Sequence, residues 1–110
     1  MEPPAVDTVR VVVNVEATID LSANNLAFDK SQITVPAGAL VTIVFNNMES
    51  IPHNFALYET SAATTSIFVG DVITGPETIT YKFRAPSAPG TYFFRCDVHP
   101  NTMTGDFIVE

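Results

Sequence analysis

The sequence predicts an all-β protein, folded as a sandwich of about seven to eight short strands. Apolar and polar residues alternate with a period close to two in several stretches. Valine, isoleucine, threonine and aromatic residues favour strands, and 8 prolines and 5 glycines divide the chain into short segments. A chain of 110 residues has the usual size of one domain. We expect a single domain over residues 1–110, with residues 1–7 as a flexible N-terminal segment.

The first half of the chain contains four predicted strand segments. Every odd position in residues 9–15 is valine, which predicts a strand, whereas the polar residues 20–25 predict a turn. Residues 26–28 and 33–35 predict two short strand pieces, with a turn after them. Residues 40–46 place apolar side chains on one face and predict a core strand.

The second half continues the same pattern. Residues 53–58 predict a strand with His53 on its apolar face, and residues 61–68, rich in small side chains, are compatible with a short helix or a loop. Residues 77–84 alternate well and predict a half-buried strand. Cys96 ends a strand on the same face as Tyr92 and Phe94, and residues 105–109 predict the last strand.

The charge of the chain limits its partners. Five basic and 12 acidic residues give a net charge of −7, which opposes binding to nucleic acid or to anionic membranes. The negative surface favours a basic partner or simply keeps the domain soluble. No apolar stretch reaches the length of about 20 residues that a membrane-spanning helix needs, and no export signal is visible. Met1 before Glu2 and two prolines fits an initiator methionine on a linker or a trimmed mature start.

Four residues suggest a metal site. Cys96, His99 and Met103 lie in one short segment between two predicted strands, and His53 begins another strand. The single cysteine cannot form an internal disulfide, so it is a buried thiol, a nucleophile or a metal ligand. The spacing of the three residues also fits a helical stripe, but the strand-like residues before Cys96 and the proline at Pro100 oppose a helix. Thiolate and thioether favour Cu(I) and imidazole serves both oxidation states, so this set suits copper.

The motifs around these residues resemble the cupredoxin family of type 1 blue copper proteins, particularly its plastocyanin and amicyanin-like members. The similar segments are residues 90–99 with Met103, residues 51–55, residues 33–38 and residues 41–46. The resemblance implies a Greek-key β-sandwich with one copper ion. It also implies that His53 Nδ1, Cys96 Sγ and His99 Nδ1 bind the ion in a near-trigonal plane, with Met103 Sδ as the long axial ligand. Met48 is a weaker alternative sulfur ligand.

The chain departs from the closest family patterns at two places. Three residues separate His99 from Met103, one more than in the amicyanin pattern and one fewer than in the plastocyanin pattern. Asn54 matches a family position that ties the two ligand loops together, commonly through a hydroxyl residue after the cysteine, but Asp97 stands there in this chain. We expect this brace to be altered or to be carried by Thr102 or Thr104, and such contacts tune the metal and orient its ligands.

The function implied by the resemblance is that of an electron carrier, not an enzyme, which cycles between Cu(I) and Cu(II). His99 would lie nearest the surface in an apolar ring, where redox proteins of the cytochrome or oxidase type dock. The candidates for the ring are Met48, Ile51, Pro52, Pro100, Pro36 and Ala37. We expect a monomer in an extracytoplasmic location, either the periplasm or the outer face of a membrane. Membrane attachment would require a parent segment that this chain lacks.

Several alternatives remain open at this stage. The sequence is also compatible with a copper-binding domain excised from a larger copper oxidase or reductase, or with a copper delivery module. A metal-free sandwich that acts as an interaction module predicts that Cys96 and His99 are dispensable. A binuclear copper site needs a second cysteine in the ligand loop, and the sequence has only one cysteine.

Overall fold

The computed structural model describes residues 15–110, which form strands and turns without a helix. The predicted flexible segment at residues 1–7 and the predicted strand at residues 9–15, apart from Val15, lie outside the described residues. No helix in the described part of the chain is long and apolar enough to cross a membrane. The strands are β1 (Glu16–Asn24), β2 (Ala27–Phe28), β3 (Gln32–Val35), β4 (Leu40–Asn47), β5 (Pro52–His53), β6 (Ala56–Tyr58), β7 (Ser66–Val69), β8 (Ile73–Thr74), β9 (Glu77–Arg84), β10 (Gly90–Arg95) and β11 (Thr104–Val109).

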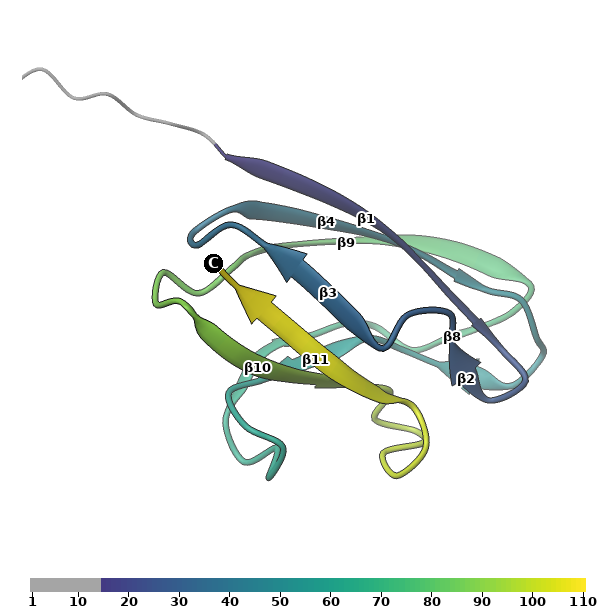
Figure 1. Ribbon diagram of the computed structural model, residues 1–110. Coiled ribbons are helices and arrows are strands. Elements are labelled where there is room, and N and C mark those ends of the chain that lie inside the picture. The colour runs from purple at the N-terminus through teal and green to yellow at the C-terminus, as the bar shows by residue number, and fades with distance from the viewer. Residues whose placement is uncertain (1–14) are drawn as a thin grey trace, which may run out of the picture.

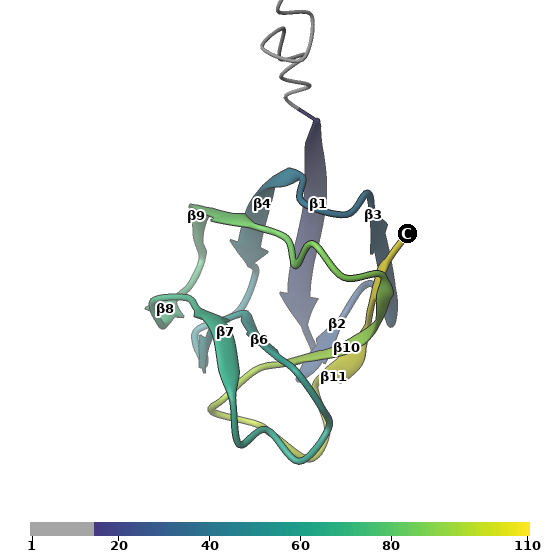
Figure 2. The same ribbon diagram turned by 90° about the vertical axis from the view of Figure 1, so that its left-hand side faces the viewer.

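The strands form a sandwich of two sheets, which confirms the predicted class (Figure 1). One sheet has four strands in the order β2-β1-β4-β9, and the other has five in the order β3-β11-β10-β6-β7. Eight strands within residues 15–110 have three or more residues, in agreement with the expected seven to eight. The short strands β5 and β8 pair only with each other, beside the two sheets. Figure 2 shows β1, β4 and β9 facing β6, β7, β10 and β11.

The predicted turn at residues 20–25 is wrong for most of its length, because β1 continues to Asn24. β1 pairs in parallel with β4, so that Leu21 lies opposite Phe45. Leu21 and Ala23 are fully buried, while the polar residues that alternate with them, Asp20, Ser22 and Asn24, lie on the other face. Only Asn25 and Leu26, with φ angles of 55° and 57°, form the turn to β2. Burial of one face outweighs the turn propensity of Asp, Ser and Asn in this segment.

Aromatic side chains fill the space between the sheets. Phe55 lies at the centre, with its ring 5.5 Å from that of Phe94 and 5.9 Å from that of Phe83. Phe83 on one sheet also contacts Phe107 on the other, with a centroid distance of 6.0 Å. Such pairs add packing energy to the burial of apolar area. This core is a rigid support for the loops at both ends of the sandwich.

The loop after β10 and the segment before β6 lie at the same end of the sandwich. The loop from β10 to β11 lies at the end opposite the C-terminus (Figure 1). Arg95, the last residue of β10, lies opposite Ala56 of β6 and Thr104 of β11. The segment before β6 therefore lies beside the loop after β10. This arrangement brings the residue His53 to the same end as Cys96, although 43 positions separate them in the chain.

Candidate metal centre

Three of the four predicted ligand residues meet at this end of the sandwich. The Sγ atom of Cys96 lies 3.7 Å from Nδ1 of His53 and 3.7 Å from Nδ1 of His99. The three potential ligand atoms lie within 4.8 Å of one another. His53 and Cys96 are completely buried, whereas His99 is partly exposed. The cluster therefore has a buried side and a single imidazole that reaches solvent.

The ligand loop is closed by its own backbone hydrogen bonds. The amide of His99 donates to the carbonyl oxygen of Cys96 at 3.1 Å, and the amide of Met103 donates to that of His99 at 3.1 Å. The amide of Cys96 in turn donates to the carbonyl oxygen of Met103 at 2.9 Å. Met103 is 1% exposed, in contrast to Met48, which is 50% exposed. Met103 is therefore buried, and its backbone is hydrogen-bonded to both Cys96 and His99.

A carboxylate fixes the ring orientation of His53. Nε2 of His53 lies 2.7 Å from Oε1 of Glu49, so the ring donates its Nε2–H to the carboxylate and directs Nδ1 at Cys96. Glu49 also accepts hydrogen bonds from the amides of Leu26 and Asn25, at 3.0 Å and 3.1 Å. The bond from Leu26, followed by that from His53, lowers the pKa of Glu49 below its ordinary value. Nothing in the local sequence pattern marks Glu49 as a site residue.

Asn47 organises the segment that leads to His53. Its side chain is fully buried at the end of β4. Nδ2 donates to the carbonyl oxygens of Ile51 and Ile73 at 2.8 Å and 3.0 Å, and Oδ1 accepts from the amide of Glu49 at 3.0 Å. One amide side chain therefore links the loop before β5 to β8. The β5–β8 pair depends on this link for its position relative to the core.

The expected brace between the two ligand loops exists in an altered form. The amide of Asp97 donates to Oδ1 of Asn54 at 2.8 Å, and the amide of Asn54 donates to Cys96 Sγ at 3.5 Å. The hydroxyl in this network belongs to Tyr58, which donates to Asp97 Oδ1 at 2.6 Å. Thr102 and Thr104 are exposed, and in residues 15–110 no side-chain hydrogen bond joins either of them to Asn54. The expectation that a threonine supplies the hydroxyl is therefore wrong.

Charge is balanced around Asp97. Nε of Arg95 donates to Asp97 Oδ1 at 2.9 Å, and the guanidinium carbon lies 4.7 Å from the ring centroid of Tyr58. Partial burial raises the pKa of Asp97, but hydrogen bonds from Tyr58, Arg95 and Asn54 outweigh this effect and hold the pKa below its ordinary value. The carboxylate is therefore ionised at neutral pH and paired with the guanidinium.

The predicted apolar ring contains two residues that lie elsewhere. Pro36 and Ala37 follow β3, which runs parallel to β11 with Val35 opposite Val109. The amide of Ala37 donates to the carbonyl oxygen of Glu110 at 2.8 Å, so both residues lie at the end remote from Met103. Their inclusion in the ring is wrong, because the parallel pairing of β3 with β11 carries the chain away from the ligand loop.

Other apolar residues are exposed at the end that carries the cluster. The large exposed side chains there are Leu26, Met48, Ile51, Val72 and Val98. Leu26 and Met48 adjoin Glu49, which contacts His53, and Val72 precedes the residue that pairs with His53. Val98 lies within the ligand loop itself. The partly exposed ring of His99 therefore lies at an end of the molecule with apolar side chains at its surface.

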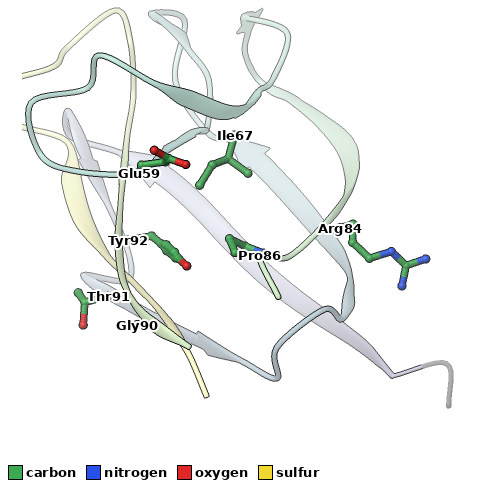
Figure 3. Close-up of a pocket in the computed structure, with 7 residues that line it drawn as sticks. All are labelled: Glu59, Ile67, Arg84, Pro86, Gly90, Thr91 and Tyr92. Atoms are coloured by element: carbon green, nitrogen blue, oxygen red, sulfur yellow. The ribbon is translucent and has the colours of Figure 1, made fainter. Parts of the chain in front are cut away.

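A hollow in the surface of the described residues lies away from this cluster. It has a volume of about 450 Å³ and is lined by Glu59, Arg84 and Tyr92 among others (Figure 3). Arg84 ends β9 and lies opposite Leu40, the first residue of β4, whereas the cluster lies beyond the last residue of β4. Its guanidinium points away from the other lining side chains in Figure 3 and donates to the carbonyl oxygen of Gly38. The hollow contains no histidine or cysteine.

The three-residue cluster fits a metal ion. Bond lengths like those of zinc, about 2.3 Å to sulfur and about 2.05 Å to nitrogen, with an angle of about 120°, place the two donor atoms about 3.8 Å apart. The two Sγ to Nδ1 distances of 3.7 Å match this separation. One thiolate and two imidazoles are the donor set of trigonal copper sites, in which a weak axial thioether completes the coordination. The spacing therefore fits a metal ion, and the donor set suits copper.

Comparison with known proteins gives consistent matches. The family model for a cupredoxin-like domain matches residues 8–109. Auracyanin-A of Chloroflexus aurantiacus is 32% identical over 84% of this chain and 74% of its own length. Its structure, described as that of a "blue" copper protein, superposes with a TM-score of 0.74 at 30% identity, over 84% of this chain and 98% of the other.

Two further solved structures are similar. Dithionite-reduced auracyanin from the photosynthetic bacterium Roseiflexus castenholzii has a TM-score of 0.75 and 28% identity, over 88% of this chain and 99% of the other. Amicyanin from Paracoccus versutus has a TM-score of 0.61 and 25% identity, over 84% of this chain and 81% of the other. The similarity thus extends over most of the chain in each comparison.

Proposed function

This chain belongs to the cupredoxin-like family, and on that premise we propose that it is a mononuclear type 1 copper protein that carries single electrons between redox partners. The observation that carries the proposal is the placement of His53 Nδ1 and His99 Nδ1 at 3.7 Å from Cys96 Sγ. The blue copper protein auracyanin A and the dithionite-reduced auracyanin support both the metal and the redox role. We propose that residues 1–110 act as one such domain.

We assign the ligands as His53, Cys96, His99 and Met103. When bound, copper supplies a one-electron couple between Cu(I) and Cu(II). Cys96 would provide the thiolate, His53 and His99 would provide imidazoles, and the buried Met103 would provide the thioether. Glu49 holds His53 in the tautomer that leaves Nδ1 free for the metal.

The surroundings of the ligands restrict their movement. His53 and Cys96 are fully buried, and the loop between β10 and β11 is closed by backbone bonds between Cys96, His99 and Met103. A site held in this way has little freedom to rearrange when the charge of the metal changes. Little rearrangement favours rapid electron transfer, which supports a carrier role over a copper delivery role.

We propose that His99 is the electron port and that a redox protein of the cytochrome or oxidase type docks over it. His99 is the one partly exposed imidazole of the cluster, and Val98, Ile51 and Met48 expose apolar surface at the same end. A chain with net charge −7 favours a basic partner at long range. The family resemblance supports an extracytoplasmic location, in the periplasm or on the outer face of a membrane.

The proposal is tested by addition of Cu(II) to the purified protein, followed by visible spectroscopy and voltammetry. We expect one copper ion per chain, an intense thiolate-to-copper band and a reversible one-electron wave. A protein that remains colourless would overturn the proposal. Rapid loss of copper to a weak chelator, without a reversible wave, would favour copper delivery instead.

Met103→Leu tests the axial ligand. We expect the variant to retain copper and its colour, but to have a higher reduction potential, because the loss of a donor destabilises Cu(II) more than Cu(I). The expected size is about a tenfold change in the equilibrium with a reference couple, which corresponds to ~59 mV for one electron. Met48→Leu is the matched control and should leave the potential unchanged, since Met48 is 50% exposed. A shift in the control but not in Met103→Leu would contradict the assignment.

Val98→Lys tests the apolar docking face through electron self-exchange between Cu(I) and Cu(II) molecules, measured by NMR line broadening. An ammonium group in the ligand loop must lose hydration when two such faces meet, so we expect the exchange rate to fall by about tenfold. Thr91→Lys is the matched control, because it changes the net charge equally at the start of β10, the far end of the strand. Equal rates in the two variants would rule out contact through this face.

A further inference from the structure

We propose that Asp97 and Arg95 are a pair of positioning residues that hold the Cys96 loop and set the reduction potential by opposing charges. The inference rests on the proposed function, because it concerns the copper couple of the same site. The two residues flank Cys96 in the chain, and Arg95 Nε donates to Asp97 Oδ1 at 2.9 Å. Neither residue has a ligand atom in the three-residue cluster.

Asp97 is the point at which three segments meet. Its carboxylate accepts hydrogen bonds from Tyr58 of β6 and Arg95 of β10, and Nδ2 of Asn54 lies 3.4 Å from Oδ2. Its amide donates to Asn54 Oδ1, and Asn54 Nδ2 donates to the carbonyl oxygen of Gly70 at 3.0 Å. The residue after Cys96 is therefore tied to the residue after His53. Removal of the carboxylate would loosen this tie without removal of a ligand.

The tyrosine hydroxyl makes this arrangement different from a simple surface ion pair. Tyr58 is 7% exposed, and its hydroxyl donates to the carboxylate at 2.6 Å. The side chains of Arg95 and Asp97 are 25% and 26% exposed. Charged groups in such partly buried positions are screened less than exposed ones. Their charges therefore act on the adjacent Cys96 more strongly than fully exposed charges would.

The signs of the two effects follow from the charge of the couple. The oxidised site carries one more positive charge than the reduced site, so a nearby carboxylate stabilises Cu(II) and lowers the potential, whereas a guanidinium raises it. In the native protein the two contributions largely cancel. Removal of one charge leaves the other uncompensated. The two single changes must therefore shift the reduction potential in opposite directions. A role limited to loop geometry gives no reason for opposite signs.

The first experiment measures reduction potentials of the copper-loaded protein for Asp97→Asn, Arg95→Gln and the double variant. We expect Asp97→Asn to raise the potential and Arg95→Gln to lower it, each by about a tenfold change in the equilibrium with a reference couple, or ~59 mV. The double variant should lie near the native value. Glu59→Gln and Arg84→Gln are matched controls of equal charge change at the remote hollow and should shift the potential much less. Shifts of the same sign in the two test variants would overturn the charge assignment.

The second experiment needs no metal and tests the positioning role. Urea unfolding of the metal-free protein is compared for Tyr58→Phe, Asp97→Ala and the double variant, because alanine removes the acceptor of the tyrosine hydroxyl. We expect the double variant to lose less stability than the sum of the single losses, because both changes break the same hydrogen bond. Strict additivity would overturn the positioning role. A colourless native protein would overturn the proposed function, while the unfolding cycle would still decide whether Asp97 holds the loop.

Discussion

Replacement of Cys96 by serine is expected to abolish the intense visible band of the copper-loaded protein. The band requires a thiolate bound to copper, and a serine hydroxyl is a hard donor that stays protonated at neutral pH. Loss of an outer partner of a metal ligand already costs 10–100-fold in affinity, so loss of the ligand itself should cost more than about 100-fold. The measurements are the visible spectrum and a copper titration of the variant.

Serine suits this test because it is similar in shape to cysteine at a fully buried position. The amide of Asn54, which donates to Sγ at 3.5 Å, can donate to the hydroxyl instead. Circular dichroism of the metal-free variant should match that of the native protein, which separates loss of the ligand from loss of the fold. Thr102→Ala, an exposed change in the same loop, is the control and should keep the full band. An intense band in Cys96→Ser would show that the Cys96 thiolate is not a ligand of the copper.

Asn47→Ala is expected to lower the free energy of unfolding by about 3 kcal/mol. The change removes three hydrogen bonds of about 1 kcal/mol each and leaves the carbonyl groups of Ile51 and Ile73, the latter buried, without this donor. A domain of this size has a total stability of about 5–15 kcal/mol, so the loss is a large fraction. Urea unfolding of the metal-free protein measures the effect, with an unchanged slope as the sign of two-state behaviour.

Asn46→Ala is the matched control for this prediction. Asn46 is the preceding residue of β4, is half-buried, and makes one long side-chain contact of 3.4 Å with Thr78. Its replacement should cost less than about 1 kcal/mol. Equal losses in the two variants would show that the position in β4, and not the hydrogen-bond network of Asn47, determines the cost. We also expect weaker copper binding in Asn47→Ala, because this network sets the position of the segment before His53.

Strands with a clear alternation were predicted well from the sequence. Residues 77–84 coincide with β9, and residues 40–46 differ from β4 by one residue. In both strands one face is buried in the core, so the period of two appears directly in the residue types. β1 was not predicted, because its inward positions include two alanines and its outward positions carry polar residues that also favour turns. The alternation from Ala17 to Ala23 was the signal available.

Short strands at the site were harder to predict. β5 and β8 have two residues each, too few for any period to appear. They pair with each other across the chain, and Asn47 bonds to both segments. The continuous strand predicted at residues 53–58 is wrong, because its two parts pair with different strands, β5 with β8 and β6 with β10 and β7. The local pattern contains no information about a partner more than 20 positions away.

The all-β class and the donor chemistry could be predicted from the sequence, because strand alternation and ligand-type side chains are properties of residue identity. One cysteine, two histidines and a methionine at strand ends were enough to predict a copper site at His53, Cys96, His99 and Met103. The groups that contact the site residues depend on the packing of the two sheets and were not predictable. Glu49, Tyr58 and Arg95 act through contacts that the packing of the two sheets creates. An acidic, aromatic or basic residue has no such role until a neighbour distant in the sequence lies within hydrogen-bond distance.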